Sequence, residues 1–382
     1  MSIRQMFPGS IVKPGFNPLA APTPSYTYDL YSWGAGTYGA LGLGNTTYYS
    51  SPKQVSATTT WLSVSGSYLT SYAIGVDNSL WSWGNNGYGQ LGNGTSYPTP
   101  IPSTPAQVGS LTNWLKVTGR YYSVLALKTN GTIWSWAQNN NGQCGLGNTT
   151  QYSSPKQIGA LTNWFDIASG NNNCLAVKTD GTLWSWGNNN LGSLGLGNTT
   201  YYSSPKQIGS LTSWLKVAAT GYAHSFAIKT DGTLWSWGGG VNGQSGLGNT
   251  TNYSSPKQVG ALTDWSDITG GYNHVIAIKT NGTLWSWGRN QVGQLGTGNT
   301  TYYSSPKQIG SLTTWSKIRG VYFASFAIKT DGTLWAWGDN TTTGQLGLGD
   351  KTNRSSPNQV GSKTNWSSIG ATQGRFTLAL AY

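Results

Sequence analysis

Short apolar runs alternate with turns along nearly the whole chain, at the spacing expected of β-strands. A unit that begins at Trp214 reads WLKVAATGYAHSFAIKTDGTLWSWGGGVNGQSGLGNTTNYSSPKQVGALTD. WLKVAA and HSFAIK have strand length, and the Asp-Gly pair before TLWSWG is a strong hairpin signal. A loop of about twenty residues follows. It ends in SSP before PKQVG, whose Pro restricts this short strand to a start or an edge. The pattern predicts four short strands per unit.

The alternation within TLWSWG predicts which side chains share a face of the sheet. With a period of two residues, Trp235 and Trp237 lie on one face, and Leu234 and Ser236 lie on the other. Two indoles per unit are therefore expected to face a neighbouring unit.

This unit recurs at an almost constant spacing of 50 to 53 residues. The second Trp of the W-x-W-G signature falls at Trp33, Trp83, Trp136, Trp186, Trp237, Trp287 and Trp337. One four-stranded sheet cannot bury both of its faces alone, whereas seven sheets around an axis cover each other as a β-propeller. We expect an all-β fold, a seven-bladed β-propeller of four-stranded blades over residues 26–382, preceded by a Pro-rich extended arm, residues 1–25.

The two ends of the chain predict how the ring closes. The last unit ends in FTLALAY, which matches HSFAIK and stops where the Asp-Gly turn would follow, and the first unit begins with YDLYSWG, which matches TLWSWG. N- and C-terminal strands are therefore expected to pair within one blade, which leaves no edge there to fray. The residues assigned to this closure are Phe376, Leu378, Leu380, Leu30 and Trp33.

The repeated pattern around GYAHSFAIKTDGTLWSWG and GQLGLG resembles the repeat of the regulator of chromosome condensation family, whose members are seven-bladed propellers. The resemblance covers Tyr26 to Tyr382 and suggests a phage or bacterial member. The family's founder exchanges nucleotide on a small GTPase and binds chromatin, while relatives are ubiquitin-ligase modules, scaffolds and little-known bacterial or viral proteins. This chain keeps the family's His only at His224 and His274 and lacks the long insertion expected of an exchange factor. The resemblance therefore implies the fold and not the exchange activity.

Composition narrows the class further. The 382 residues are 8% charged, with 22 Lys and Arg against ten acidic residues, all Asp, and a net charge of +12. Few straight-chain helix formers and many Trp, Tyr and Gly exclude a mostly helical protein. Cys144 and Cys174 lie outside any C-x-x-C pair and are expected to be free thiols. No apolar stretch has the length of a signal peptide or a membrane span, so we expect synthesis in the cytosol.

Candidate chemistry is sparse. Asp180, Asp231 and Asp331 stand in T-D-G hairpin turns, where turn chemistry explains them. The two His have no Cys, Glu or third His nearby, so hydrogen bonds at strand ends are more expected than a metal site. No nucleophile elbow, P-loop or H-E-x-x-H motif occurs. We therefore expect no enzyme, no catalytic residue, no metal and no cofactor.

Lysines recur in two places of the unit, which predicts two interrupted rings of charge. The two sets are Lys53, Lys156, Lys206, Lys257 and Lys307 in SPKQ, and Lys128, Lys178, Lys229, Lys279 and Lys329 before the hairpin turn. Nucleic-acid sites concentrate their cations in one patch, so distributed rings are better explained as solvated charge that protects strand edges. An anionic cell-surface polymer is left open as a ligand.

Paired tyrosines recur in the long loops, within TYYSSPKQ. They could stack on sugars of a cell-surface glycan, or brace their own loops against the neighbouring blade; both readings are open. The six residues are Tyr48, Tyr49, Tyr201, Tyr202, Tyr302 and Tyr303.

The near-identity of the units favours a scaffold or a multivalent binder over an active centre. Phe7, Phe16 and Leu19, spaced between the prolines of the arm, suit a tether to a partner groove. We expect a non-enzymatic structural propeller in a virion, a tail or capsid decoration or adhesion protein assembled in the host cytoplasm and held to other structural proteins by its arm. The alternative is a cytoplasmic protein-interaction or GTPase-exchange module like the family's founder, and an enzyme acting on glycans is a third reading.

Overall fold

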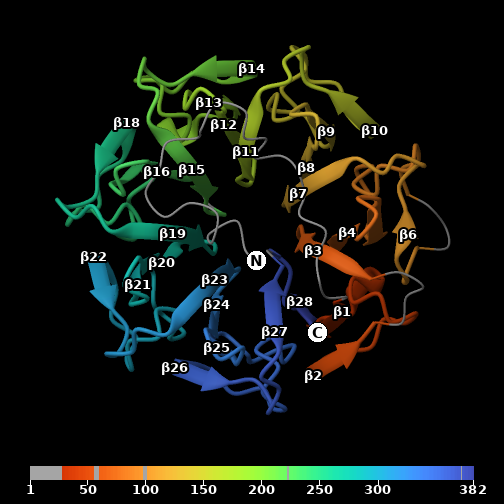
Figure 1. The fold of residues 1–382 in the computed structure, drawn as a ribbon, viewed down its shortest axis with the longest axis vertical. Helices are drawn as coiled ribbons and strands as arrows, with labels where there is room; N and C mark the ends of the chain where they lie inside the picture. Colours follow the sequence, from red (N-terminus) through yellow and green to blue (C-terminus); the bar gives the residue numbers. More distant parts are fainter. Residues whose placement is uncertain (1–27, 56–59, 98–100, 222, 371) are drawn as a thin grey trace.

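The computed structural model describes residues 28–382 apart from 56–59, 98–100, 222 and 371. Seven antiparallel four-stranded sheets stand radially around one axis, with the first strand of each near the centre and the last at the rim (Figure 1). The predicted all-β seven-bladed propeller is confirmed. Blade I consists of β27, β28, β1 and β2, and blades II to VII each take four consecutive strands, from β3–β6 to β23–β26.

The inner strands begin at the isolated Trp of each unit, and the second strands carry the HSFAIK-like runs. The inner strands are β3 (Trp61–Gly66), β7 (Trp114–Arg120), β11 (Trp164–Ser169), β15 (Trp214–Ala219), β19 (Trp265–Gly270), β23 (Trp315–Val321) and β27 (Trp366–Ile369). The second strands are β4 (Thr70–Gly75), β8 (Ser123–Lys128), β12 (Asn173–Lys178), β16 (His224–Lys229), β20 (His274–Lys279), β24 (Ala324–Lys329) and β28 (Phe376–Ala381).

The third strands hold the W-x-W-G signature, and the outer strands form the rim. The third strands are β1 (Asp29–Gly34), β5 (Leu80–Gly84), β9 (Ile133–Ala137), β13 (Leu183–Gly187), β17 (Leu234–Gly238), β21 (Leu284–Gly288) and β25 (Leu334–Gly338). The outer strands are β2 (Tyr49–Gln54), β6 (Ala106–Gln107), β10 (Tyr152–Gln157), β14 (Tyr202–Gln207), β18 (Tyr253–Gln258), β22 (Tyr303–Gln308) and β26 (Arg354–Gln359). Two short 3-10 turns, η2 (Thr37–Gly39) and η3 (Asn190–Gly192), lie in long loops.

Most outer strands begin at a tyrosine, ahead of the Pro at which the sequence pattern placed their start. In β14, Tyr202 pairs with Gly187 and Lys206 pairs with Ser185, with an irregular register between them. Pro205 lies inside this strand. A rim strand can accept Pro because one of its sides has no neighbouring strand to which an N–H would donate.

The hydrophobic cores lie between blades, as the alternation in TLWSWG predicts. Trp237 is fully buried with Leu183 of blade IV, and half-buried Trp235 packs on the same cluster. Leu234 points the other way, into the core shared with Trp265 of blade VI. The Trp237 indole N–H also donates to the carbonyl oxygen of Ser193 in blade IV, at 3.0 Å. Each blade thus covers one face of each neighbour.

The ring closes by pairing of strands from the two ends of the chain, as predicted. In blade I, β1 pairs antiparallel with β28, with Leu30 opposite Leu380 and Ser32 opposite Leu378. Leu30, Leu378, Leu380 and Phe376 are buried in the core between blades I and II, while Trp33 is buried in the core toward blade VII.

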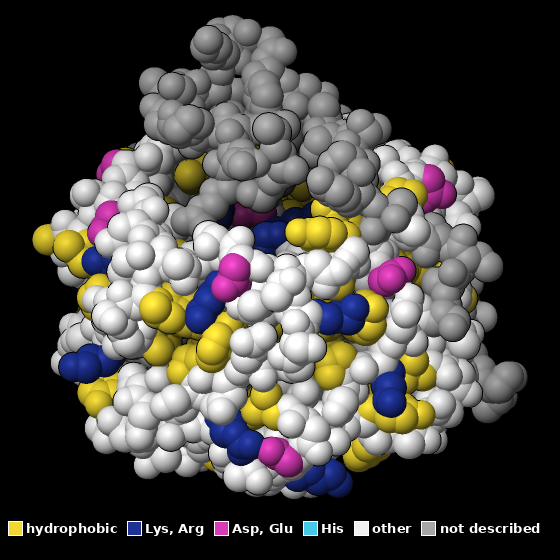
Figure 2. Space-filling view, turned by 60° about the horizontal axis from the view of Figure 1, so that its bottom comes forward, with side chains coloured by type: hydrophobic (Ala, Val, Ile, Leu, Met, Phe, Trp, Pro, Cys, Tyr) yellow, Lys and Arg dark blue, Asp and Glu magenta, His cyan; other side chains and the backbone are white. Residues whose placement is uncertain are grey.

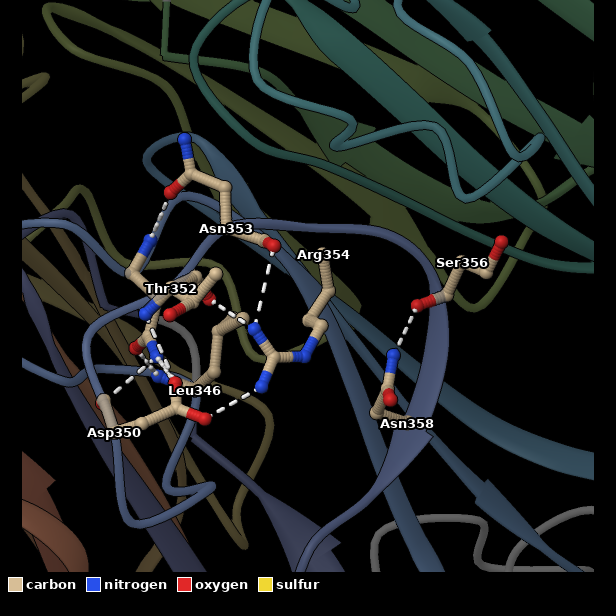
Figure 3. A network of polar contacts seen from close by, with 8 residues as sticks. Leu346, Asp350, Thr352, Asn353, Arg354, Ser356 and Asn358 are labelled. Carbon is tan, nitrogen blue, oxygen red and sulfur yellow. Dashed lines mark hydrogen bonds and ion pairs between the residues drawn. The ribbon is translucent and has the colours of Figure 1, made fainter.

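The long loops are braced by a recurring side-chain pair, and blade VII replaces that pair with an ion pair. In blade IV the Asn198 amide donates to the hydroxyl of Tyr202 at 3.5 Å. In blade VII the corresponding residues are Asp350 and Arg354, whose Oδ2 and Nη2 atoms lie 2.5 Å apart, and Arg354 also donates to the carbonyl of Thr352 (Figure 3). Asp and Arg therefore substitute for Asn and Tyr with a different interaction.

One of the two lysine rings is not solvated, which corrects the sequence-based expectation. Lys128, Lys178, Lys229 and Lys279 are buried and Lys329 is half-buried. Each ammonium group lies between the inner-strand Trp and the first Trp of W-x-W-G, 3.8 to 5.2 Å from the ring centroids. Two indole faces compensate the lost hydration of the cation. Sequence spacing did not reveal this sandwich because its two Trp come from different strands.

The other lysine ring is exposed, as expected. Lys206 lies 5.4 Å from the ring centroid of Tyr202, and the other four SPKQ lysines have the same arrangement. Lys and Arg side chains are scattered singly over the face displayed in Figure 2 and form no continuous patch there.

Candidate binding face and central channel

The residues expected to tether the protein, Phe7, Phe16 and Leu19, lie outside the described residues, as does the arm of residues 1–25. That expectation stays a prediction. No helix among the described residues is long and apolar enough to cross a membrane.

The loop tyrosines make contacts within their own loops. The hydroxyl of Tyr201 donates to Asn190 at 2.5 Å, and the hydroxyl of Tyr302 donates to Gln291 at 3.5 Å. The hydroxyls of Tyr48 and Thr37 share a hydrogen bond of 2.7 Å. The second tyrosine of each pair, in contrast, is half-buried beside the SPKQ lysine. These are Tyr49, Tyr202 and Tyr303. The contacts therefore account for the six tyrosines as loop braces, and the possibility of a glycan stays a prediction.

Both histidines are buried hydrogen-bonding residues. His224 Nδ1 lies 2.5 Å from the carbonyl oxygen of Gly239, and His274 Nε2 lies 3.0 Å from the hydroxyl of Ser325. Burial lowers the pKa of each imidazole to about 3. Asn173 occupies the equivalent place in blade IV and donates to the hydroxyl of Ser225. A neutral amide and a neutral imidazole thus serve the same inter-blade contact.

The thiols and the hairpin carboxylates also have local roles. Burial raises the pKa of Cys144 to about 12 and raises that of Cys174 as well, so both stay protonated. Asp231 Oδ1 accepts bonds from the hydroxyl and N–H of Thr233, which lower the pKa of that carboxyl. Among the described residues no three His, Cys, Asp or Glu side chains lie together as metal ligands would.

One face of the ring carries aromatic residues that the sequence pattern did not single out. The turn after the inner strand holds a tyrosine at the same position in blades II, III, VI and VII. The backbone N–H of Tyr68 donates to the carbonyl of Tyr121 at 3.2 Å, and Tyr272 donates to Tyr322 at 2.8 Å. Each pair of rings is in contact, with centroids 5.5 and 5.3 Å apart.

The larger aromatic cluster combines two blades. Tyr122 lies 4.5 Å from Tyr88, 4.7 Å from Tyr121 and 5.9 Å from Tyr68, measured between ring centroids. Tyr121 is exposed and has a φ of 54°, in the left-handed region that costs a non-Gly residue roughly 1 to 3 kcal/mol. Six other described non-Gly residues, among them Tyr38 and Leu191, also have a positive φ, so the ring contacts and not the backbone conformation single out this cluster. We define the tyrosine cluster as Tyr68, Tyr88, Tyr121 and Tyr122.

A second, smaller cluster lies on the same type of turn in blades VI and VII. Tyr272 and Tyr322 stack near Phe323, whose ring centroid is 4.2 Å from that of Tyr322. The guanidinium carbon of Arg289 lies 5.0 Å above the Phe323 ring. Aromatic rings and an arginine are the residue types most enriched at protein interfaces.

Arg120 closes the central channel beneath these turns. It belongs to blade III, and its guanidinium donates to the carbonyl of Ala219 in blade V at 2.5 Å and to those of Gly270 and Gly271 in blade VI at 2.9 and 2.8 Å. The amide of Gln373 in blade I, oriented by its neighbours, accepts a bond from Arg120 Nε at 2.5 Å. One side chain therefore joins four blades across the axis.

Aligning the units would have revealed part of this face. A tyrosine follows the inner strand in five of seven units, at positions 68, 121, 222, 272 and 322. Such an aromatic lies outside every predicted strand, so packing within a blade does not explain it. Arg120 breaks the repeat, since the equivalent positions hold small or uncharged residues.

Comparison with known proteins gives the family and the fold. Residues 29–380 match the model of the RCC1-like domain. The fold is similar to Prp20p from Saccharomyces cerevisiae, at 20% identity and a TM-score of 0.83, over 94% of this chain and 92% of that chain. It is similar to yeast RCC1 (Prp20) bound to Kap60, at 21% identity and 0.83, over 93% and 89%. Human WBSCR16 gives 19% and 0.81, over 93% and 100%.

These comparisons correct the functional expectation. The matching structures are of yeast RCC1 and human WBSCR16, so the expectation of a virion tail, capsid or adhesion component is wrong, and the alternative of an interaction or exchange module is favoured. The match to the family model covers all seven blades. The chain belongs to the RCC1-like domain family.

Proposed function

We propose that this chain is a non-enzymatic protein-binding module that holds a folded protein partner on the face bearing the tyrosine cluster. The observation that carries the proposal is the contact between Tyr68, Tyr88, Tyr121 and Tyr122, four tyrosines from two neighbouring blades. Tyrosine supplies large contact area with few rotatable bonds, and it is enriched among the residues that dominate binding energy.

The chemistry of the ionisable residues supports binding over catalysis. Hairpin carboxylates such as Asp231 are engaged by their own turns, and the histidines are neutral and buried. General acid–base catalysis needs a group that exchanges protons near neutral pH beside the substrate. Neither a carboxylate with a lowered pKa nor an imidazole with a pKa of about 3 fits that role.

The structural relatives support a protein as the partner. The yeast relative is described by its binding to Gsp1p and histones and by its complex with Kap60. We place this chain in the cytoplasm, where its two buried thiols meet a reducing environment. A more specific version of the proposal is nucleotide exchange on a small GTPase, although this chain lacks the long insertion expected of an exchange factor.

Site-specific photocross-linking tests the binding face. A photoreactive phenylalanine analogue replaces Tyr121 in one variant and Tyr201, on a long loop, in a control variant. We expect a defined protein adduct from position 121 in cells of the source organism, and none of that mass from position 201. The partner identified by mass spectrometry, once purified, should bind the Tyr122→Ala variant about tenfold or more weakly.

An assay with Gsp1p separates binding from exchange. The full chain is added to Gsp1p loaded with fluorescent GDP, and both complex formation and nucleotide release are measured. Accelerated release would establish exchange.

In the photocross-linking test, equal adducts from positions 121 and 201 would contradict the proposed binding face.

A further inference from the structure

The wall of the central channel is charged in an ordered way. Counting the Trp of each inner strand as the first residue, the fourth residue of all seven strands packs in a core between blades. Strand alternation then places the third, fifth and seventh residues on the opposite side, toward the axis, although Ala168, Ala218 and Val321 also contact these cores. In five consecutive blades the third residue alternates in sign. These residues are Lys116, Asp166, Lys216, Asp267 and Lys317.

Neighbouring members of this layer are paired. Lys116 Nζ lies 2.6 Å from Asp166 Oδ1, and Lys216 Nζ lies 3.0 Å from Asp267 Oδ1. Lys317 has no carboxylate within ion-pair distance among the described residues and donates to the carbonyl of Ser367. The side chains of Lys116 and Lys216 are 43% and 38% exposed, so solvent reaches this layer.

Two arginines lie deeper, and neither has a carboxylate within ion-pair distance among the described residues. Burial lowers the pKa of Arg319, and attraction to the carboxylate of Asp267 opposes this shift in part. Arg319, a fifth-position residue, donates from Nε to the carbonyl of Ile369 at 3.2 Å, and its two terminal nitrogens have no hydrogen-bond partner in the described part of the chain. Arg120, a seventh-position residue, bonds backbone carbonyls and an amide. Burial, followed by repulsion from Arg319, lowers the pKa of Arg120 to about 9.

The chain cannot neutralise this channel with its own carboxylates. The three channel-facing layers hold five cations and two carboxylates, so the wall carries a net charge of +3. The other eight Asp side chains of the chain have places outside these layers, as Asp264 does beside Lys279 and Asp350 does beside Arg354. The residues outside the described part contain no Asp or Glu. The excess of positive charge along the channel wall therefore favours the binding of an anion from solution.

We propose that the central channel is a binding site for one small oxyanion of the phosphate type, held by the two terminal nitrogens of Arg319. A guanidinium presents parallel N–H groups that match two oxygens of such an anion. Thr269, in the same layer, accepts a bond from the N–H of Gly320 and retains its own hydroxyl proton to donate. Arg120 closes the channel at the tyrosine face, so the anion enters from the lysine layer. This site does not depend on the proposed protein-binding face.

Titration of the full chain with inorganic phosphate, at constant ionic strength maintained with NaCl, tests the proposal by calorimetry. We expect one saturable site per chain. Arg319→Gln should weaken phosphate binding about tenfold, the loss of one charge-assisted hydrogen-bonding group. The control Arg354→Gln changes an arginine in a long loop and should leave phosphate binding unchanged.

A variant of opposite sign keeps the test decisive if Arg319→Gln destabilises the fold. Asp267→Asn removes one of the two channel carboxylates and should tighten phosphate binding several-fold. Absence of saturation up to about 10 mM phosphate would overturn the proposal. Equal weakening by Arg319→Gln and Arg354→Gln would overturn it too, since that result indicates diffuse surface screening. Weaker phosphate binding by the Asp267→Asn variant would also overturn the proposal, since it would show that the integrity of the fold, and not the charge of the channel, governs phosphate binding.

Discussion

The indole N–H of Trp33 donates a hydrogen bond to the backbone carbonyl of Gln345, which lies 312 residues further along the chain, at 2.8 Å. This bond joins blade I to blade VII at the closure of the ring. The same bond recurs at the other blade boundaries, for example from Trp186 to the carbonyl of Gln143 at 3.0 Å. The closure therefore uses the interaction that joins consecutive units elsewhere.

Replacing Trp33 with Phe should destabilise the ring more than replacing Trp164 with Phe. Trp33→Phe removes one of the two donors to the buried carbonyl of Gln345, which keeps only the hydroxyl of Thr377 at 3.0 Å. The buried indole nitrogen of Trp164, in contrast, has no hydrogen-bond partner among the described residues. We expect a difference of about 1 kcal/mol in the free energy of unfolding, measured with urea. Equal losses would show that ring volume, and not the hydrogen bond, holds the closure.

Leu378→Ala should destabilise the protein by about 2 to 5 kcal/mol, since it opens a cavity in the core between blades I and II. The matched change Leu211→Ala, at a leucine that is 49% exposed, should alter the free energy of unfolding by no more than about 0.5 kcal/mol.

Deletion of residues 376–382 should prevent cooperative unfolding, while deletion of residues 2–24 should not. Thermal melts followed by circular dichroism test all four variants. If the chain without residues 376–382 keeps the melting temperature of the full-length chain, the pairing of β1 with β28 does not stabilise the ring.

Lys178→Met should lower stability by about 1 kcal/mol more than Lys206→Met. Met retains much of the aliphatic stem but loses the cation, which at Lys178 lies 4.9 Å from the ring centroid of Trp164 and 3.9 Å from that of Trp184. Lys206 is exposed and lies beside one Tyr ring only. Chemical unfolding of both variants measures the difference. If Lys178→Met is neutral, desolvation of the ammonium group cancels its attraction to the indoles.

Stability should fall as the pH drops from about 6.5 toward 4. His224 and His274 stay neutral in the fold with a pKa of about 3, whereas the unfolded chain takes up protons near the ordinary imidazole pKa of about 6.5. The unfolded state therefore binds more protons in this window, so acid favours unfolding by up to about 1.4 kcal/mol per pH unit for each His. The double variant His224→Asn and His274→Asn uses the residue found at Asn173. The melting temperature of this variant should depend less on pH above 4.5. An unchanged pH dependence would show that the two buried histidines do not cause the loss of stability in acid.

The sequence predicts the fold because each unit repeats the same local signals. Strand alternation was enough to place Trp237 and Leu234 on opposite faces, and the unfinished last unit predicted the pairing of β28 with β1. Features formed by residues from separate strands were harder to predict. Lys229 was expected in solvent because its indole partners, Trp214 and Trp235, come from two other strands.

The candidate sites depend on contacts that only the closed ring creates. Tyr121 and Tyr68 belong to turns about fifty residues apart, and no local pattern brings their rings together. Arg120 looks like an ordinary basic residue in the sequence, whereas in the fold it reaches carbonyls of two other blades. The arm and its apolar residues stay a prediction, because they lie outside the described part of the chain.

Blade I takes strands from both ends of the chain, so it is the last blade to be completed during synthesis. Blades II to VII each become complete when four consecutive strands have left the ribosome, whereas β1 and β2 emerge first and receive β28 only at the end. At 5 to 20 residues per second, this interval is roughly 20 to 70 s. The nascent chain therefore carries an unpaired strand edge and the exposed indole of Trp33 until its last strand is made, so the risk of aggregation at this end belongs to synthesis and not to the finished ring.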